Sequence, residues 1–184
     1  MTRSESFLAA IPGIWRAPGE SLRARLPVLT EERLLFFVYL ICLLQFLTGM
    51  PAGIALAREG GHDLTAFLGA RFVAALFFAP LFLYALAGLS HLIARRFGGQ
   101  GSYFEARAAL FWALIGAIPL LFLTALTRQT AIAAGVNLFA GLGFAWLWSG
   151  TLAEVENFGH KRVFGVLFIF GAALLILAQL GATP

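Results

Sequence analysis

The sequence predicts an all-α fold, a polytopic membrane protein built as a bundle of five transmembrane helices. Of its 184 residues, 60% are hydrophobic and only 12% are charged, and the mean hydropathy is +0.88. Soluble domains carry about 25% charged residues. Five stretches lack Asp, Glu, Lys and Arg, at residues 34–57, 72–90, 108–127, 130–153 and 163–182. Each is close to the roughly 20 residues that a helix needs to cross the bilayer core. Because backbone groups inside lipid must bond to one another, we expect each stretch to be helical.

The basic residues predict an N-in/C-out orientation. Ten Lys and Arg residues fall in the N-terminal segment and in the second and fourth loops, whereas the other side holds only Arg58, Arg71 and Arg128. An excess of Lys and Arg marks the cytoplasmic side. Basic residues scattered between apolar spans orient a membrane protein, so no nucleic-acid partner is expected.

Residues 1–33 are predicted to be a cytoplasmic segment that precedes the membrane domain, residues 34–182. Residues 18–26 read PGESLRARL, which fits a short helix lying on the membrane surface. Trp15 and the neighbouring arginines suit the headgroup region of an anionic leaflet. The alternative is a disordered basic leader.

The ends of the spans carry local signals. Ser102 and Glu105 fit the S-x-x-E capping box that opens a helix, and Asp63 and Thr130 are candidate N-caps of the second and fourth helices. Pro51 is expected to kink or end the first helix near its outer end. Pro119 lies in the middle of the third span, where a neighbouring helix must bond the carbonyl that it frees.

A stripe of small or polar side chains recurs every four residues along the fourth span. Such a face lets helices approach closely, and an asparagine on it can bond across the contact. The alternative is that the asparagine lines a polar pathway. The members of this helix-packing stripe are Ala133, Asn137, Gly141, Ala145 and Ser149.

The second loop combines glycines, two arginines and a helix N-terminus, a pattern that can cradle a phosphate such as a lipid headgroup. The alternative is a sharp turn between helices. Phe104 stands where G-x-G-x-x-G needs its third glycine, and no Walker loop is present. The residues of this candidate lipid-headgroup or partner loop are Arg95, Arg96, Gly98, Gly99, Gly101, Ser102 and Glu105.

Signs of an enzyme or a metal site are weak. The fourth loop groups acids and bases that, with His91, raise the alternative of a metal site: Glu154, Glu156, His160, Lys161 and Arg162. No ligand spacing such as H-E-x-x-H is present, so a solvated, self-paired loop is expected. No G-x-S-x-G occurs, and Cys42 is the single cysteine. Arg71 and Arg107, near helix starts, are expected to extend their side chains to the interface. The sequence therefore predicts no catalytic site, no metal and no cofactor.

Residues 89–106, LSHLIARRFGGQGSYFEA, resemble the Yip1 domain. Members of that family carry a helix end, then Phe-Gly-Gly-x-Gly-Ser/Thr-Phe, then Glu-Ala or a similar pair. Tyr103 stands where the aromatic residue often falls. The resemblance covers residues 34–179 and implies a five-helix bundle with a cytoplasmic N-terminus. Eukaryotic members bind Rab GTPases in vesicle traffic, but their Asp-Leu-x-Gly-Pro motif does not occur here, so that role is not carried over.

We therefore expect a non-enzymatic Yip1-like protein that acts by binding, as an accessory or organising component of a larger membrane-protein assembly. Twelve arginines against one lysine suggest a bacterium, and hence its inner (cytoplasmic) membrane. The expected partners are membrane lipids and other integral membrane proteins, or a second copy of the chain. The alternative is a transporter or lipid-handling protein with a headgroup site at the glycine loop.

Overall fold

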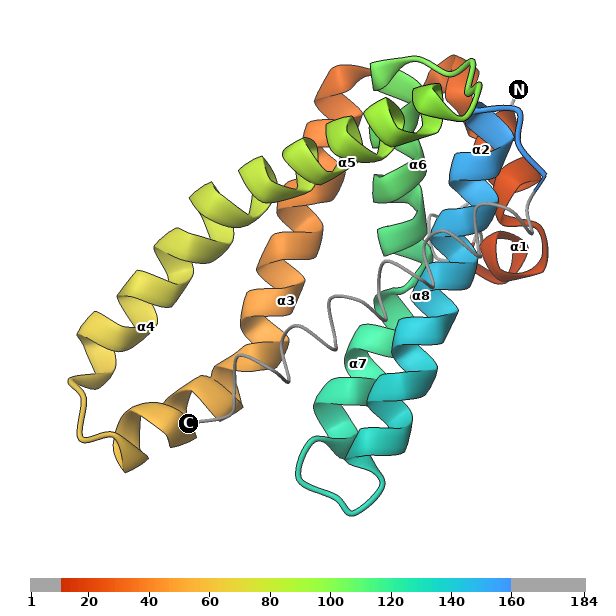
Figure 1. Ribbon diagram of the computed structural model, residues 1–184. Helices are drawn as coiled ribbons and strands as arrows, with labels where there is room; N and C mark the ends of the chain where they lie inside the picture. The colour runs from red at the N-terminus through yellow and green to blue at the C-terminus, as the bar shows by residue number, and fades with distance from the viewer. Residues whose placement is uncertain (1–10, 160–184) are drawn as a thin grey trace, which may run out of the picture.

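The computed structural model describes residues 11–159, and within them all regular secondary structure is helical. Three short helices open the chain and long helices follow (Figure 1). The end of α5, the start of α6 and the end of α8 lie together at one end of the molecule, and the α7–α8 turn lies at the other. This arrangement matches a chain that crosses back and forth between two sides.

The first long helix, α3 (Glu31–Glu59), covers the first predicted span and extends beyond both of its ends. Thr30 caps it by accepting from Arg33 N, and Glu31 and Glu32 suit its N-terminal dipole. The expectation that Pro51 ends the helix is wrong, because α3 continues for two further turns to Glu59.

The second span is a continuous helix of 33 residues, Leu64–Arg96. It consists of α4 (Leu64–Val73), a π-helical stretch η3 (Ala74–Phe78) and α5 (Ala79–Arg96). Asp63 is its N-cap, as predicted, and accepts from Ala66 N at 2.7 Å. The π-helical stretch ends two residues before Pro80, which has no N–H to donate to the carbonyl of residue 76 within that stretch.

The third span is bent. α6 (Tyr103–Gly116) and α7 (Ile118–Thr127) meet at 45°, with Pro119 in the first turn of α7. Trp15 from α1 donates its indole N–H to the carbonyl of Gly116 at 2.9 Å, which satisfies a carbonyl beside the break. Pro119 lacks the N–H that would bond to the carbonyl of Ile115, so the bond from Trp15 to Gly116 O is not the one expected, and the expectation about the freed carbonyl stays a prediction.

The fourth span, α8 (Ala133–Val155), packs along α6 to form the core. Residues 108–113 of α6 are all buried, and Thr151 of α8 donates to Ala109 O at 2.9 Å across the contact. Thr130 is not the N-cap of α8, as the sequence suggested. Its hydroxyl instead bonds back to Thr127 O at 2.7 Å, and the helix starts three residues later.

The described part of the N-terminal segment, from residue 11 onward, is helical and packs into the bundle. It forms α1 (Ile11–Arg16), α2 (Pro18–Arg25) and a short 3₁₀ turn, η2 (Leu26–Val28). The helix predicted over residues 18–26 is therefore present. It packs against α8, and Ile14 and Leu22 are fully buried. Trp15, expected at the headgroup level, lies half-buried against the bundle.

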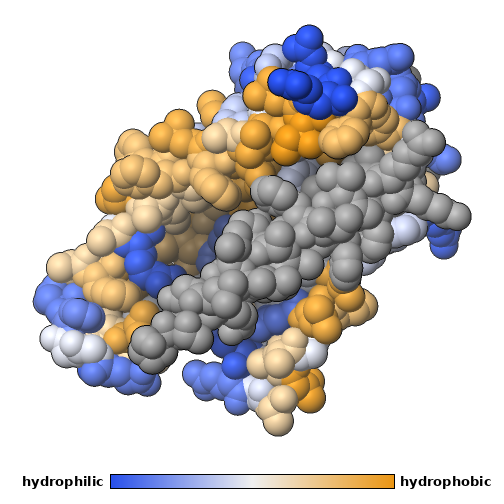
Figure 2. Space-filling model, in the orientation of Figure 1, coloured by the Kyte–Doolittle hydropathy of each residue, from blue (hydrophilic) through white to orange (hydrophobic). Residues whose placement is uncertain are grey.

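Three helices of the described chain are long and apolar enough to cross a membrane, and the bent pair α6–α7 makes a fourth if it is one span. The first four predicted spans thus correspond to helices, and the fifth, residues 163–182, lies outside the described residues. Hydrophobic residues cover α4 and α5 on the face seen in Figure 2, with hydrophilic residues toward both ends. The structure is that of an all-α, multi-pass membrane protein.

Candidate functional site: the glycine loop and the His91–Glu156 pair

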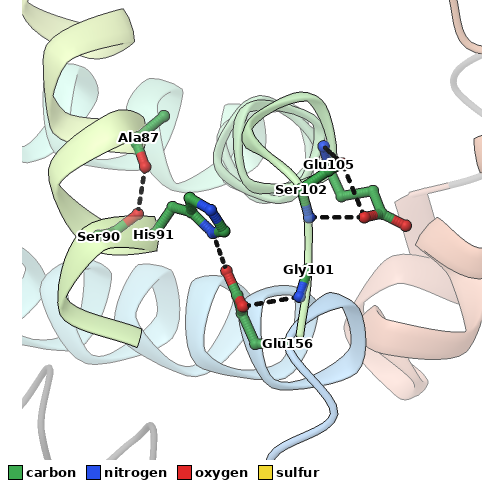
Figure 3. A network of polar contacts seen from close by, with 7 residues as sticks. All are labelled: Ala87, Ser90, His91, Gly101, Ser102, Glu105 and Glu156. Carbon is green, nitrogen blue, oxygen red and sulfur yellow. Dashed lines mark hydrogen bonds and ion pairs between the residues drawn. The ribbon is translucent and has the colours of Figure 1, made fainter. Parts of the chain in front are cut away.

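The glycine loop, residues 97–102, joins α5 to α6 beside the C-terminal end of α8 (Figure 3). Ser102 and Glu105 form the predicted capping box at the start of α6: Glu105 N donates to Ser102 Oγ, and Ser102 N donates to Glu105 Oε2. The capping box sets the point at which the loop ends.

Every backbone N–H of the glycine loop is already bonded within the chain. A phosphate cradle needs several such groups free and pointing at the ligand. Phe97 and Gly99 donate to Ala94 O, Gly98 to Arg95 O, Gln100 to Glu156 O at 3.3 Å, Gly101 to Glu156 Oε2 at 3.0 Å and Ser102 to Glu105 Oε2 at 2.8 Å. The N–H groups of the loop are therefore used within the chain, and the anion that the loop binds is a side chain of the protein itself.

That anion is the carboxylate of Glu156, which follows the last residue of α8. Its side chain is fully buried, and its Oε1 lies 2.7 Å from Nδ1 of His91, whose side chain is 3% exposed. A carboxylate only accepts hydrogen bonds, so His91 makes this one with its proton on Nδ1. Tyr103 packs edge-on against the imidazole ring. Glu156 thus ties together α5, the glycine loop and the end of α8.

Two of the loop glycines are needed because Glu156 lies so close. A Cβ on Gly99 would meet the Glu156 carboxylate and would stand 3.0 Å from Ala94 O. A Cβ on Gly101 would stand 2.9 Å from Val155 O and 3.0 Å from Glu156 Oε2. Gly98 has a different reason, a φ of +88°, which side chains rarely adopt.

On the α8 side, Asn157 continues the contact. Its φ is +57°, a left-handed conformation that asparagine tolerates, and its Nδ2 donates to Gln100 Oε1 at 3.2 Å. The turn after α8 therefore follows the glycine loop closely.

The charged candidates of the loop face outward. Arg95 and Arg96 are exposed in the last turn of α5, and Phe97 beside them is 70% exposed. Arg107, expected to reach toward the interface, instead forms an ion pair with Glu31 at the start of α3.

Only some members of the predicted packing stripe are buried against other described residues. Ser149 is buried, Ala133 and Ala145 are partly buried, and Asn137 and Gly141 are exposed. The closest approaches on α8 lie instead at Gly143, against Trp15 and Leu120, and at Gly150, whose carbonyl lies beside Gly19. The role of the stripe stays a prediction.

Sequence reasoning misjudged His91 and Glu156. It placed both in a solvated cytoplasmic cluster and raised a metal site as the alternative. Both side chains are buried and paired, and residues 11–159 contain no group of three potential metal ligands. Of that cluster, His160, Lys161 and Arg162 lie outside the described residues. No sequence pattern links two residues that are 65 positions apart, so the pair could not be read from spacing.

Comparison with known proteins supports the resemblance seen in the glycine loop. The sequence profile of the Yip1 domain matches residues 13–181. No curated protein and no solved structure gives a match. The match begins within α1 and includes all of α2, the helix that packs against α8. With the glycine loop and the multi-pass helical fold in place, we conclude that this chain belongs to the Yip1 domain family.

Proposed function

We propose that this chain is a non-enzymatic protein of the bacterial inner membrane that acts by binding other integral membrane proteins, as an accessory or organising component of a larger assembly. Yip1 family members are generally non-enzymatic membrane proteins. The basic residues favour a cytoplasmic position for the glycine loop. The proposed contact surface is Arg95, Arg96 and Phe97, at the end of α5.

The observation that carries this proposal is an exposed aromatic side chain on a backbone that is held in place. Phe97 is 70% exposed, although the adjoining loop is bonded to Glu156 and Glu105. Aromatic residues and arginine are enriched in protein interfaces. A surface that is already ordered loses little conformational entropy when a partner binds.

The second candidate, lipid handling with a headgroup site at the glycine loop, has weaker support. All six N–H groups of the loop are used within the chain, so a headgroup there would meet only the exposed Arg95 and Arg96. Two exposed arginines attract anionic lipid without forming an enclosed site.

The test is native mass spectrometry of the tagged full-length protein, extracted from its own membranes in mild detergent. We expect a membrane-protein partner at fixed stoichiometry. The triple variant Arg95→Gln/Arg96→Gln/Phe97→Ala should retain less than a tenth of that partner. Phe78→Ala is the matched control, because Phe78 is also a highly exposed phenylalanine but lies in the apolar helix.

Two results would contradict the proposal. One is a lone chain, or a chain carrying only phospholipid, under conditions that preserve other membrane complexes. The other is equal loss of the partner in the triple variant and in Phe78→Ala, because that would separate binding from the end of α5.

A further inference from the structure

A cavity of about 490 Å³ opens between α3, the α4–η3–α5 helix and the turn after α7, far from the glycine loop. Its lining includes Cys42, Gln45, Phe46, Arg71, Ala75 and Arg128. Hydrophilic residues are visible in the hollow beside α4 in Figure 2. The volume lies within the roughly 300–1,000 Å³ of small-molecule sites.

The side chain of Arg71 lines this cavity, is exposed, and passes close to two glycines of α3. A Cβ on Gly53 would lie 3.4 Å from Arg71 Nε, and one on Gly49 would lie 3.7 Å from Nη2. The two glycines are four residues apart, so they form one notch on the face of α3. Phe67 packs against the guanidinium on the other side, 5.9 Å from ring centroid to Cζ. The expectation that Arg71 extends to the interface stays a prediction, and the contacts with α3 and Phe67 are an addition to it.

Both arginines lack an acidic partner in the described part of the chain. Glu31, Glu154 and Glu156 pair with other residues, and the lining described for the cavity includes no Asp or Glu. Two arginines beside a cavity whose described lining holds no acid give that cavity a positive potential. The cavity therefore favours an anion.

The position of the two arginines matches the level of lipid headgroups. Arg71 directly precedes the apolar stretch 72–90, and Arg128 directly follows the stretch 108–127. Two helices that run in opposite directions thus place their arginines at the same boundary of the apolar region. Because both side chains line the same cavity, a phosphate bound in it is attracted by both guanidinium groups.

Below the arginines the cavity becomes largely apolar. From Gly49 to Cys42, the α3 residues that line the cavity span seven residues, or about 10 Å at roughly 1.5 Å per residue. That is about a third of a bilayer core of roughly 30 Å. Phe46, Ala75 and Ala79 line this part, with Gln45 as a polar exception. Ala74 and Ala75 belong to the π-helical stretch, a feature that often marks functional sites.

From these observations we infer that the cavity binds an anionic phospholipid, with its phosphate between Arg71 and Arg128 and part of a hydrocarbon chain along Phe46 and Ala75. This site is distinct from the proposed contact surface at Phe97, and it lies on the side predicted to face away from the cytoplasm. The test of this lipid site is independent of the test of the proposed function.

The test measures lipid binding to the full-length protein in detergent by native mass spectrometry. The probes are phosphatidylglycerol, phosphatidylcholine with the same acyl chains, and inorganic phosphate. We expect phosphatidylglycerol to bind at least tenfold more tightly than either of the others. Arg71→Gln/Arg128→Gln should lose at least tenfold in affinity for phosphatidylglycerol. The matched control is Arg16→Gln/Arg58→Gln, which removes the same charge from two exposed arginines that do not line the cavity and should bind normally.

Two further variants keep the inference testable if the double variant folds poorly. Arg128→Gln alone changes an exposed side chain in a turn and should weaken binding several-fold. Ala75→Phe fills the apolar part without changing charge and should also reduce binding. Equal binding of phosphatidylcholine would overturn the role of the arginines. Equal binding of inorganic phosphate would overturn the role of the apolar part. An equal loss in the Arg16/Arg58 control would overturn the assignment of the site to the cavity.

Discussion

Glu156 connects three parts of the described chain, namely α5, the glycine loop and the end of α8. Its carboxylate is fully buried and accepts hydrogen bonds from two segments, through His91 and the backbone of Gly101. A buried carboxylate is tolerated only when it is paired and hydrogen-bonded. The glycines of the loop, which look like a ligand cradle in the sequence, are there in part because this side chain needs the space.

Adding one methyl group at Gly99 tests this explanation. Gly99→Ala should lower the free energy of unfolding by about 1–3 kcal/mol, because the new Cβ overlaps the Glu156 carboxylate and the Ala94 carbonyl. Gly88→Ala is the control, since a Cβ there has no neighbour within 4 Å and alanine favours the helix. The measurement is thermal unfolding of both variants in the same detergent. Equal melting temperatures would show that Gly99 is not needed for packing.

Removing the His91 side chain should lower the free energy of unfolding more than neutralising the Glu156 carboxylate. His91→Ala leaves a buried carboxylate with an unpaired oxygen and should cost about 3–5 kcal/mol. Glu156→Gln retains an acceptor for Gly101 and should cost less, because no buried charge remains.

The control for the buried pair is Arg23→Gln, which breaks the Arg23–Glu154 pair on the surface of the same region. Because Arg23 is 65% exposed, its loss should cost no more than about 1 kcal/mol. Denaturant unfolding of the three variants, His91→Ala, Glu156→Gln and Arg23→Gln, measures how much each one lowers the free energy of unfolding. A His91→Ala variant as stable as Arg23→Gln would mean that the buried pair contributes little.

Helices pack closely in this fold where small residues meet. α2 lies against α8 because Gly19 faces Gly150, and a Cβ on Gly19 would stand 3.0 Å from Gly150 O and 2.9 Å from Glu154 Cβ. In lipid, where helices gain little from leaving the solvent, such close packing is a main source of association. α1 adds the indole bond from Trp15 beside the break between α6 and α7. α2 thus packs on α8, and α1 bonds to the carbonyl of Gly116 beside the bend in the third span.

Gly19→Ala should loosen α2 from α8. The backbone of α8 cannot move aside as a flexible side chain can, so we expect a loss of about 1–3 kcal/mol. Faster cleavage in the N-terminal segment during limited proteolysis is the readout. Gly13→Ala, in α1 and with no neighbour within 4 Å of its Cβ, should leave the cleavage rate unchanged. Equal cleavage in both variants would show that the N-terminal helices do not depend on this contact.

Across the molecule, alternate loops lie at opposite ends, and the side with more Lys and Arg is expected to be cytoplasmic. Cysteine labelling tests this orientation, starting from a Cys42→Ala background that removes the single native cysteine. Gln129→Cys, in the turn after α7, should react with a membrane-impermeant maleimide in intact spheroplasts. Gln100→Cys, in the glycine loop, should react only after the cells are opened. The reverse pattern would invert the proposed topology and move the cavity of Arg71 and Arg128 to the cytoplasmic side.

Features that depend on neighbouring residues along the chain could be predicted from the sequence. Long uncharged stretches predicted the described spans because helices in lipid need about 20 apolar residues, and Ser102 and Asp63 predicted caps because a cap bonds to residues three positions away. Thr130 shows the limit of that reasoning, since an N-cap residue can also bond back to the preceding helix. The family resemblance, too, came from one contiguous loop.

Contacts between distant segments could not be predicted in this way. Glu156 meets His91 and Gly101, Arg71 meets Gly49 and Gly53, and Trp15 meets Gly116 only once the helices are packed. A charged or glycine residue near a helix end has the same local pattern whether it faces water, lipid or another helix. Burial decides between those roles, and burial is a property of the packed bundle rather than of any stretch of sequence.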